Sequence, residues 1–358
     1  MTLLFTLGPS NAQQSNKPPE CLATSTSPPE ARFVTVEPGV QLQVLDWGGS
    51  GEAMVLLTGL GDNAHVYDDF AWQFTDYFHV IGITRRGFGM SSKPKTGYDL
   101  VTRVADDVAV LKAFNISKAV FVGHSVAGNE LSALGSSHPD LVDKLVYLDA
   151  LDLYALFTKV PELPPQPITA ADTRSLKTFS AAVARYGGVR TPIADQCDFL
   201  EFGPSGEIVG STTPDFVTNQ IKHGLEPTDY HDIQAPRLGI FATLFTDLRG
   251  PYYFYLSPAD QAEFDSVFRA IVAFQQHAIQ RFSSHGLNSP APIVLTLPLR
   301  EPVANEPTVE VYHYVFINNE AFVVREMRKF LGIPFMPTGA TEGTGSVSEG
   351  QGLGSPTE

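Results

Sequence analysis

The residues that could most clearly do chemistry are Gly123-His124-Ser125-Val126-Ala127. An apolar run over 119–122 precedes them, as in a strand buried on both faces, and Leu131 and Leu134 follow at helical spacing. Ser125 therefore falls on a strand-to-helix corner. Small residues two before and two after the serine suit a sharp turn that lifts the hydroxyl out of the sheet. We predict that Ser125 is a nucleophile.

The segments around this corner alternate between strands and helices. An amphipathic helix is predicted over 101–114, and a hairpin is expected over 32–47. Buried strands are predicted over 53–58, 79–84, 119–122, 144–149 and 236–242. Strands that alternate with helices in this way predict an α/β fold with a mostly parallel, doubly wound sheet.

The alternation stops between residues 150 and 235, where a helix near 173–186 is expected but no clear buried strand. We predict that this segment is a helical cap inserted over the sheet. Ser257 and Pro258 then open a long helix to about residue 282, with the serine as N-cap. A further strand is expected over 292–297, and a closing helix over 320–331.

Four sequence features, in this order, resemble the α/β-hydrolases, in particular the group of capped esterases and epoxide-hydrolase-like proteins. They are Thr58-Gly-Leu60, Arg86-Gly-Phe-Gly-Met-Ser91, the Ser125 corner, and His313 ahead of a closing helix. The resemblance covers residues 32–331. It implies an α/β-hydrolase fold in which Ser125 lies on the family's nucleophile elbow. Epoxide hydrolases and dehalogenases of this family carry aspartate at the elbow, so their chemistry is not expected here.

A serine hydroxyl needs a base to attack a carbonyl at neutral pH. The family places its histidine last, after a final strand and before the closing helix. Among nine histidines, His313 follows a strand-like run over 308–312 and precedes the helix expected over 320–331. We predict that His313 is the base.

The carboxylate that would hold the imidazole remains open between four residues. Asp149 ends the strand over 144–149, which resembles family members that use this earlier position. Asp247 and Glu301 follow the two later strands, and Asp152 lies close behind Asp149. Asp149 is our first choice, and Asp247, Glu301 and Asp152 are the alternatives.

An oxyanion hole requires two fixed donors where charge develops on the substrate oxygen. By resemblance these are the backbone N–H groups of Leu60 and Val126. Thr58 replaces the histidine that the family usually carries in this loop, which leaves the backbone donors in place. We expect Arg86 to be structural and to pair with carbonyls or carboxylates. The aromatic run Tyr252-Tyr-Phe-Tyr255 and the cap residues Tyr154, Phe157 and Phe179 could line an acyl pocket or pack in the core.

The composition of the 358-residue chain limits its partners. Hydrophobic residues make up 43% and charged residues 18%, so a sizeable core is expected. The formal charge of −15 disfavours nucleic acid and anionic membrane surfaces. No apolar run reaches the length of a transmembrane helix, so no membrane-spanning segment is expected. A small ester is the expected substrate, no metal or organic cofactor is expected, and the oligomeric state is not predicted.

The N-terminus and the two cysteines bear on the compartment. Residues 3–12 resemble the end of a signal peptide, which favours a secreted or periplasmic protein over a cytoplasmic one. We expect Cys21 and Cys197 to be unrelated thiols, with one disulfide as the alternative. The domains are then a leader and disordered linker (1–31), a core in two parts (32–149 and 236–333), the cap (150–235) and a disordered tail (334–358).

These features together predict a serine hydrolase that cleaves a small to medium carboxylic ester through an acyl-enzyme. A lactonase, a peptidase or a carbon–carbon bond hydrolase would use the same three side chains. A catalytically idle homologue that binds a small ligand beneath the cap is the alternative of a different class.

Overall fold

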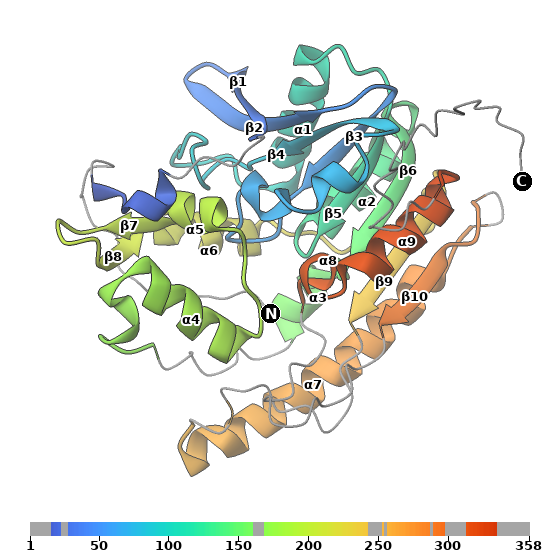
Figure 1. Ribbon diagram of the computed structural model, residues 1–358. Coiled ribbons are helices and arrows are strands. Elements are labelled where there is room, and N and C mark those ends of the chain that lie inside the picture. Colours follow the sequence, from blue (N-terminus) through green and yellow to red (C-terminus); the bar gives the residue numbers. More distant parts are fainter. Residues whose placement is uncertain are drawn as a thin grey trace, which may run out of the picture.

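The computed structural model of the protein describes residues 16–22, 28–159, 168–242, 253, 256–286, 289–297 and 313–334. Its centre is an eight-stranded sheet with the order β1-β2-β4-β3-β5-β6-β9-β10 (Figure 1). The strands are β1 (Glu30–Glu37), β2 (Val40–Gly48), β3 (Glu52–Leu57), β4 (Phe78–Ile83), β5 (Ala119–His124), β6 (Val142–Leu148), β9 (Arg237–Ala242) and β10 (Ile293–Leu297).

The sheet is parallel from β4 to β10, while β2 pairs antiparallel with both β1 and β4. The predicted α/β class, the N-terminal hairpin and the strand over 292–297 are therefore confirmed. Because the carboxyl ends of parallel strands meet at one edge, residues that follow β3, β5, β6 and β9 are brought together there.

Helices cover both faces of the sheet (Figure 1). Apolar residues of α1 (Leu100–Ala113), α2 (Ala127–Ser137) and α7 (Pro258–Ser283) pack on one face. The other face is covered by η3 (Ala64–Tyr67), η4 (Ala71–Gln73), α8 (Val315–Asn318) and α9 (Glu320–Leu331). The predicted start of α7 is confirmed, because the Ser257 hydroxyl accepts a hydrogen bond from the Asp260 N–H at 3.3 Å.

Between β6 and β9 the chain forms a separate group of short elements. They are α3 (Leu153–Lys159), η6 (Asp172–Arg174), α4 (Leu176–Gly187), α5 (Ile193–Phe199), β7 (Leu200–Phe202), β8 (Ile208–Ser211) and α6 (Asp215–His223). The expectation of no strand in this segment is wrong, since β7 and β8 form an antiparallel pair. With three and four residues, these strands are too short to show an alternating pattern. Phe202 and Ile208 nevertheless pack in one apolar cluster with α4.

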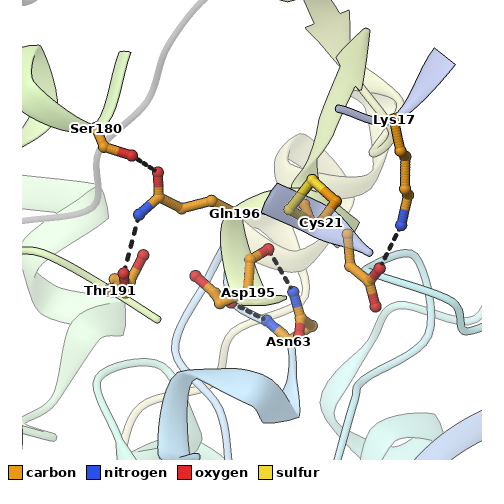
Figure 2. Close-up of a disulfide and its surroundings, with 9 residues drawn as sticks. Lys17, Cys21, Asn63, Ser180, Thr191, Asp195 and Gln196 are labelled. Carbon is orange, nitrogen blue, oxygen red and sulfur yellow. Dashed lines mark hydrogen bonds and ion pairs between the residues drawn. A yellow bond between two sulfur atoms is a disulfide. The ribbon is translucent and has the colours of Figure 1, made fainter. Parts of the chain in front are cut away.

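The N-terminal prediction also needs correction. Cys21 and Cys197 are joined in a disulfide, so they are not unrelated thiols, and Cys21 ends the short helix η2 (Pro19–Cys21) (Figure 2). Residues 16–22 therefore pack beside the inserted segment, where Lys17 pairs with Asp198 at 2.7 Å. Strand β1 begins at Glu30, inside the range expected to be a linker. No helix in the described ranges is both long and apolar enough to cross a membrane.

Candidate active site

Ser125 lies on the predicted corner between β5 and α2. Its φ angle is +56°, a left-handed conformation that side-chain-bearing residues rarely adopt and that strains the backbone. A Cβ added at Gly123 would lie 2.8 Å from the Leu131 side chain, so glycine lets α2 pack closely against the strand end. The chain thus turns sharply at Ser125, which is itself 2% exposed.

Asp149 lies at the end of the neighbouring strand β6 and also has a positive φ, +45°. The Ala242 N–H, at the end of β9, donates to Asp149 Oδ1 at 3.0 Å. The second carboxylate oxygen, Oδ2, lies 2.8 Å from His313 Nδ1. The structure therefore brings the first-choice carboxylate and the predicted base together, although 164 residues separate them in sequence.

The alternative carboxylates behave differently. Asp152 is 1% exposed and forms an ion pair with Arg281 rather than with His313. Asp247 and Glu301, together with the strand-like run over 308–312, lie outside the described residues. The structure therefore leaves Asp247 and Glu301 untested, and it shows that Asp152 pairs with Arg281.

Burial disfavours the charged form of both partners in the Asp149–His313 pair. It raises the pKa of Asp149 to about 7. Burial, reinforced by the nearby His124 ring, lowers the pKa of His313 well below its usual value. Because Nδ1 of His313 faces the carboxylate, it carries the proton in the neutral ring, and Nε2 is left with a free lone pair. The imidazole can therefore accept a proton at Nε2.

His313 packs against the end of the strand that carries Ser125. His124 Nε2 donates to the His313 carbonyl oxygen at 3.0 Å, and the centroids of the two rings lie 4.4 Å apart. Since His124 directly precedes Ser125, the imidazole and the serine share one edge of the sheet. Among the described residues, no hydrogen bond joins the Ser125 hydroxyl to the His313 ring.

The two predicted oxyanion donors also lie at this edge. The side chains of Leu60, which follows β3, and Val126, which precedes α2, are buried in one apolar cluster. Within the described part of the chain, neither backbone N–H donates a hydrogen bond to another backbone group. Their role as oxyanion donors remains a prediction.

A polar network that the sequence analysis missed lies behind these residues. The Tyr314 hydroxyl donates to Asp62 Oδ1 at 2.8 Å, and Asp62 Oδ2 lies 3.5 Å from His124 Nδ1. A Cβ on Gly59 would come within 2.6 Å of that carboxylate oxygen and 2.7 Å of His124 Nδ1, so a larger residue there would displace Asp62 or His124. In the sequence, an aspartate in a glycine-rich loop and a tyrosine after the histidine were the available signals, and both are common.

The inserted segment contacts the loop after β3 directly (Figure 2). The Asn63 N–H donates to Asp195 Oδ1 at 3.1 Å, and the Asn63 side-chain amide donates to the Asp195 carbonyl oxygen at 2.9 Å. Asp195 belongs to α5, as does the disulfide-bonded Cys197. Helix α5 thus connects two segments: the disulfide joins it to the N-terminal segment, and Asp195 joins it to the loop that carries Leu60.

Apolar side chains from the inserted segment gather beside Leu60 and Val126. Leu153, Val217, Ile221 and Leu225 are buried in the same cluster, with Tyr154 and Phe157 packed against it. Phe179 belongs instead to a separate cluster around Cys197. Of the three aromatic candidates in the inserted segment, two therefore lie near the predicted oxyanion donors and one does not.

Comparisons with known proteins agree with this fold. Residues 52–188 match the family model of the alpha/beta hydrolase fold. The chain is 33% identical over 102 residues to a 2-(acetamidomethylene)succinate hydrolase from Mesorhizobium japonicum, covering 28% of this chain and 36% of that protein. It is 33% identical over 180 residues to a non-heme chloroperoxidase from Streptomyces lividans, covering 49% of this chain and 60% of that protein.

The crystal structure of E-2-(acetamidomethylene)succinate hydrolase superposes with a TM-score of 0.57 at 20% identity, covering 85% of this chain and 99% of that one. The family match over residues 52–188, together with the shared fold, confirms the predicted α/β-hydrolase superfamily. The narrower group of capped esterases and epoxide-hydrolase-like proteins stays a prediction. Its matched segment spans about a third of the first of the two curated relatives and about three fifths of the second. Relatives with hydrolase activity support a hydrolase, without identifying the bond that this chain cleaves.

Proposed function

We propose that the protein is a serine hydrolase that cleaves a small to medium carboxylic ester through an acyl-enzyme. In this proposal Ser125 is the nucleophile, His313 the base and Asp149 the carboxylate that holds the imidazole. The observation that carries it is the 2.8 Å contact between Asp149 Oδ2 and His313 Nδ1, at the strand edge where Ser125 turns out of the sheet.

The reaction would proceed in two steps. His313 Nε2 takes the proton of the Ser125 hydroxyl as the serine oxygen bonds to the ester carbonyl carbon, and the imidazolium then protonates the departing alcohol. Water, deprotonated by the same nitrogen, attacks the acyl-enzyme, and the proton returns to Ser125 as the acid leaves. Asp149 stabilises the imidazolium in both steps, and its contact with Ala242 fixes its orientation.

The developing negative charge would be held by the Leu60 and Val126 N–H groups, each worth on the order of 3–4 kcal/mol in such sites. The apolar cluster around these donors favours an uncharged acyl group over a charged one. We further propose that residues 150–235 act as the cap over this pocket, because Asn63 contacts α5 and Leu60 packs with α6.

A secreted or periplasmic location is part of the proposal. The Cys21–Cys197 disulfide supports it, since disulfides persist in oxidising compartments. The check is to isolate the protein from its natural source, denature it without a reducing agent and count its free thiols. No reactive thiol is expected, and two would contradict the oxidising location.

The experiment compares Ser125→Ala with the wild-type protein on short p-nitrophenyl esters. Turnover should fall by about 10,000-fold or more. The melting temperature should stay within about 2 °C, because among the described residues the hydroxyl makes no hydrogen bond that alanine would lose. Activity that persists in Ser125→Ala would contradict the assignment. A folded wild-type protein without turnover on esters, lactones and amides would favour a ligand-binding homologue.

A further inference from the structure

A buried arginine connects the two segments that would supply the oxyanion donors. Arg85 pairs with both carboxylate oxygens of Glu130, Nε to Oε1 at 2.8 Å and Nη2 to Oε2 at 2.6 Å. The same guanidinium donates to the carbonyl oxygens of Thr58 at 3.0 Å and Gly59 at 3.2 Å. Arg85 is 5% exposed and Glu130 is 2% exposed, so solvent competes little for these contacts.

We call the Arg85–Glu130 ion pair, with its hydrogen bonds to the Thr58 and Gly59 carbonyl oxygens, the bridge. It joins the loop that carries the Leu60 N–H to the helix that begins next to the Val126 N–H. Leu60 directly follows the Thr58-Gly59 carbonyls that Arg85 holds, and Glu130 lies in the first turns of α2, the helix that begins next to Val126. The planar guanidinium makes four hydrogen bonds in a fixed fork, so it sets the separation between the loop and the helix. We propose that Arg85 is a positioning residue of the oxyanion hole, a role that rests on the proposed function.

Glu130, the carboxylate of the bridge, stays ionised at neutral pH. Burial opposes the charge of Glu130, but Arg85 and Arg103 together hold its pKa below the usual value. Arg103 Nη1 lies 3.5 Å from Glu130 Oε1 and is itself fully buried. The neighbouring Asp107 has a pKa raised well above its usual value, chiefly by burial and by the nearby Glu130 carboxylate. The bridge is therefore ionic throughout the neutral range.

The next residue in the chain provides a matched control. Arg86 is 1% exposed and pairs with both oxygens of Asp106, Nε to Oδ2 at 2.6 Å and Nη2 to Oδ1 at 2.7 Å. It also contacts Glu37 of β1 at 2.9 Å, which confirms the structural role expected for it. Its hydrogen bonds join α1 and β1, and none reaches the Thr58-Gly59 carbonyls. Arg86 thus reproduces the burial and the ion pair of Arg85 without the contact to the loop.

The test compares Arg85→Lys with Arg86→Lys in ester turnover. A lysine keeps the charge, but its single nitrogen has three donors and cannot reproduce the four hydrogen bonds of the planar guanidinium. We expect Arg85→Lys to lower kcat by about 10- to 100-fold, less than the roughly 100- to 1,000-fold loss when an oxyanion donor is removed outright, with KM changed less than about threefold. Arg86→Lys should lose a similar amount of thermal stability but keep kcat within about threefold of wild type.

A second readout separates positioning from general destabilisation. A boronic acid that forms a tetrahedral adduct on Ser125 should bind Arg85→Lys at least about tenfold more weakly, whereas the carboxylic acid product should bind equally well. If Arg85→Lys fails to fold, Glu130→Asp replaces it, with Asp106→Asn as its control and the same pattern expected. Equal kcat losses in the two arginine variants, or no loss in Arg85→Lys, would overturn the proposal. Inactivity of the wild-type protein would instead contradict the proposed function itself.

Discussion

The two halves of the candidate site are built from different kinds of charge. On the nucleophile side, Arg85 and Glu130 are buried and joined by two hydrogen bonds, and the pKa of Glu130 lies below its usual value. On the histidine side, burial raises the pKa of Asp149 to about 7 and lowers that of His313. The first pair keeps its charges at neutral pH, whereas Asp149 of the second pair lies close to its titration.

This difference matches the tasks that the proposal gives to each half. A buried ion pair contributes little net stability, because desolvation opposes the attraction, but it fixes the geometry of the groups it joins. A general base must instead gain and lose a proton in every turnover, and the lowered pKa of His313 keeps its ring neutral and ready to accept one. The comparison suggests that burial serves rigidity in one half and proton transfer in the other.

The sharpest way to break this comparison is to remove the charge of Asp149. Asp149→Asn should lower kcat by about 100- to 10,000-fold, because the amide cannot stabilise the imidazolium and favours the wrong tautomer. Asp247→Asn, at the alternative position after the later strand, should stay within about threefold of wild type. Steady-state kinetics on the same ester measures both variants. The reverse result would move the acid behind β9.

A change of pH should have a smaller effect on kcat/KM than the Asp149→Asn substitution has on kcat. The required state has an ionised Asp149 and a neutral His313. Since the pKa of Asp149 is about 7, kcat/KM should fall about tenfold per unit as the pH drops below 7. In Asp149→Asn the residual activity should lack this limb and fall only at more acidic pH, because the pKa of His313 is lowered by burial. Identical limbs in the two proteins would contradict the assignment of the titration to Asp149.

The contribution of Glu130 to folding stability should change with pH in the opposite direction to that of Asp149. A lowered carboxyl pKa means that the Glu130 contribution to stability is present at neutral pH and is lost only as the pH falls through its folded value, below about 4.5. A raised pKa means that Asp149 costs stability when ionised, and this cost begins to shrink as the pH falls through about 7 and is gone below the ordinary carboxyl pKa of 3.8. Activity lost at pH 6 should therefore return fully at pH 8, without unfolding.

Much of this arrangement follows from local sequence pattern. Apolar runs and helical spacing predicted the strand edges, the Ser125 corner and the N-cap at Ser257, since each depends on a few neighbouring residues. The resemblance to the family then pointed to His313 and to Asp149 as first choice. The choice among four carboxylates stayed open because it depends on which strand end faces a histidine far away in sequence.

Other features were not predictable for physical reasons. Arg85 resembles a surface residue in sequence, and its burial becomes visible only when Glu130 from α2 lies opposite. Cys21 and Cys197 lie 176 residues apart in sequence, so no short spacing pattern predicts their disulfide. The β7–β8 hairpin is too short for alternation to show. Each of these depends on contacts between distant segments rather than on periodicity.

The most direct test of the central claim is covalent labelling. The purified protein is treated with a fluorophosphonate, digested and mapped by mass spectrometry, with His313→Ala and Ser125→Ala in parallel. The account predicts a single adduct on the peptide that contains Ser125, slowed by at least about 100-fold in His313→Ala and absent in Ser125→Ala. An unlabelled but folded wild-type protein, or an adduct on another residue, would contradict it.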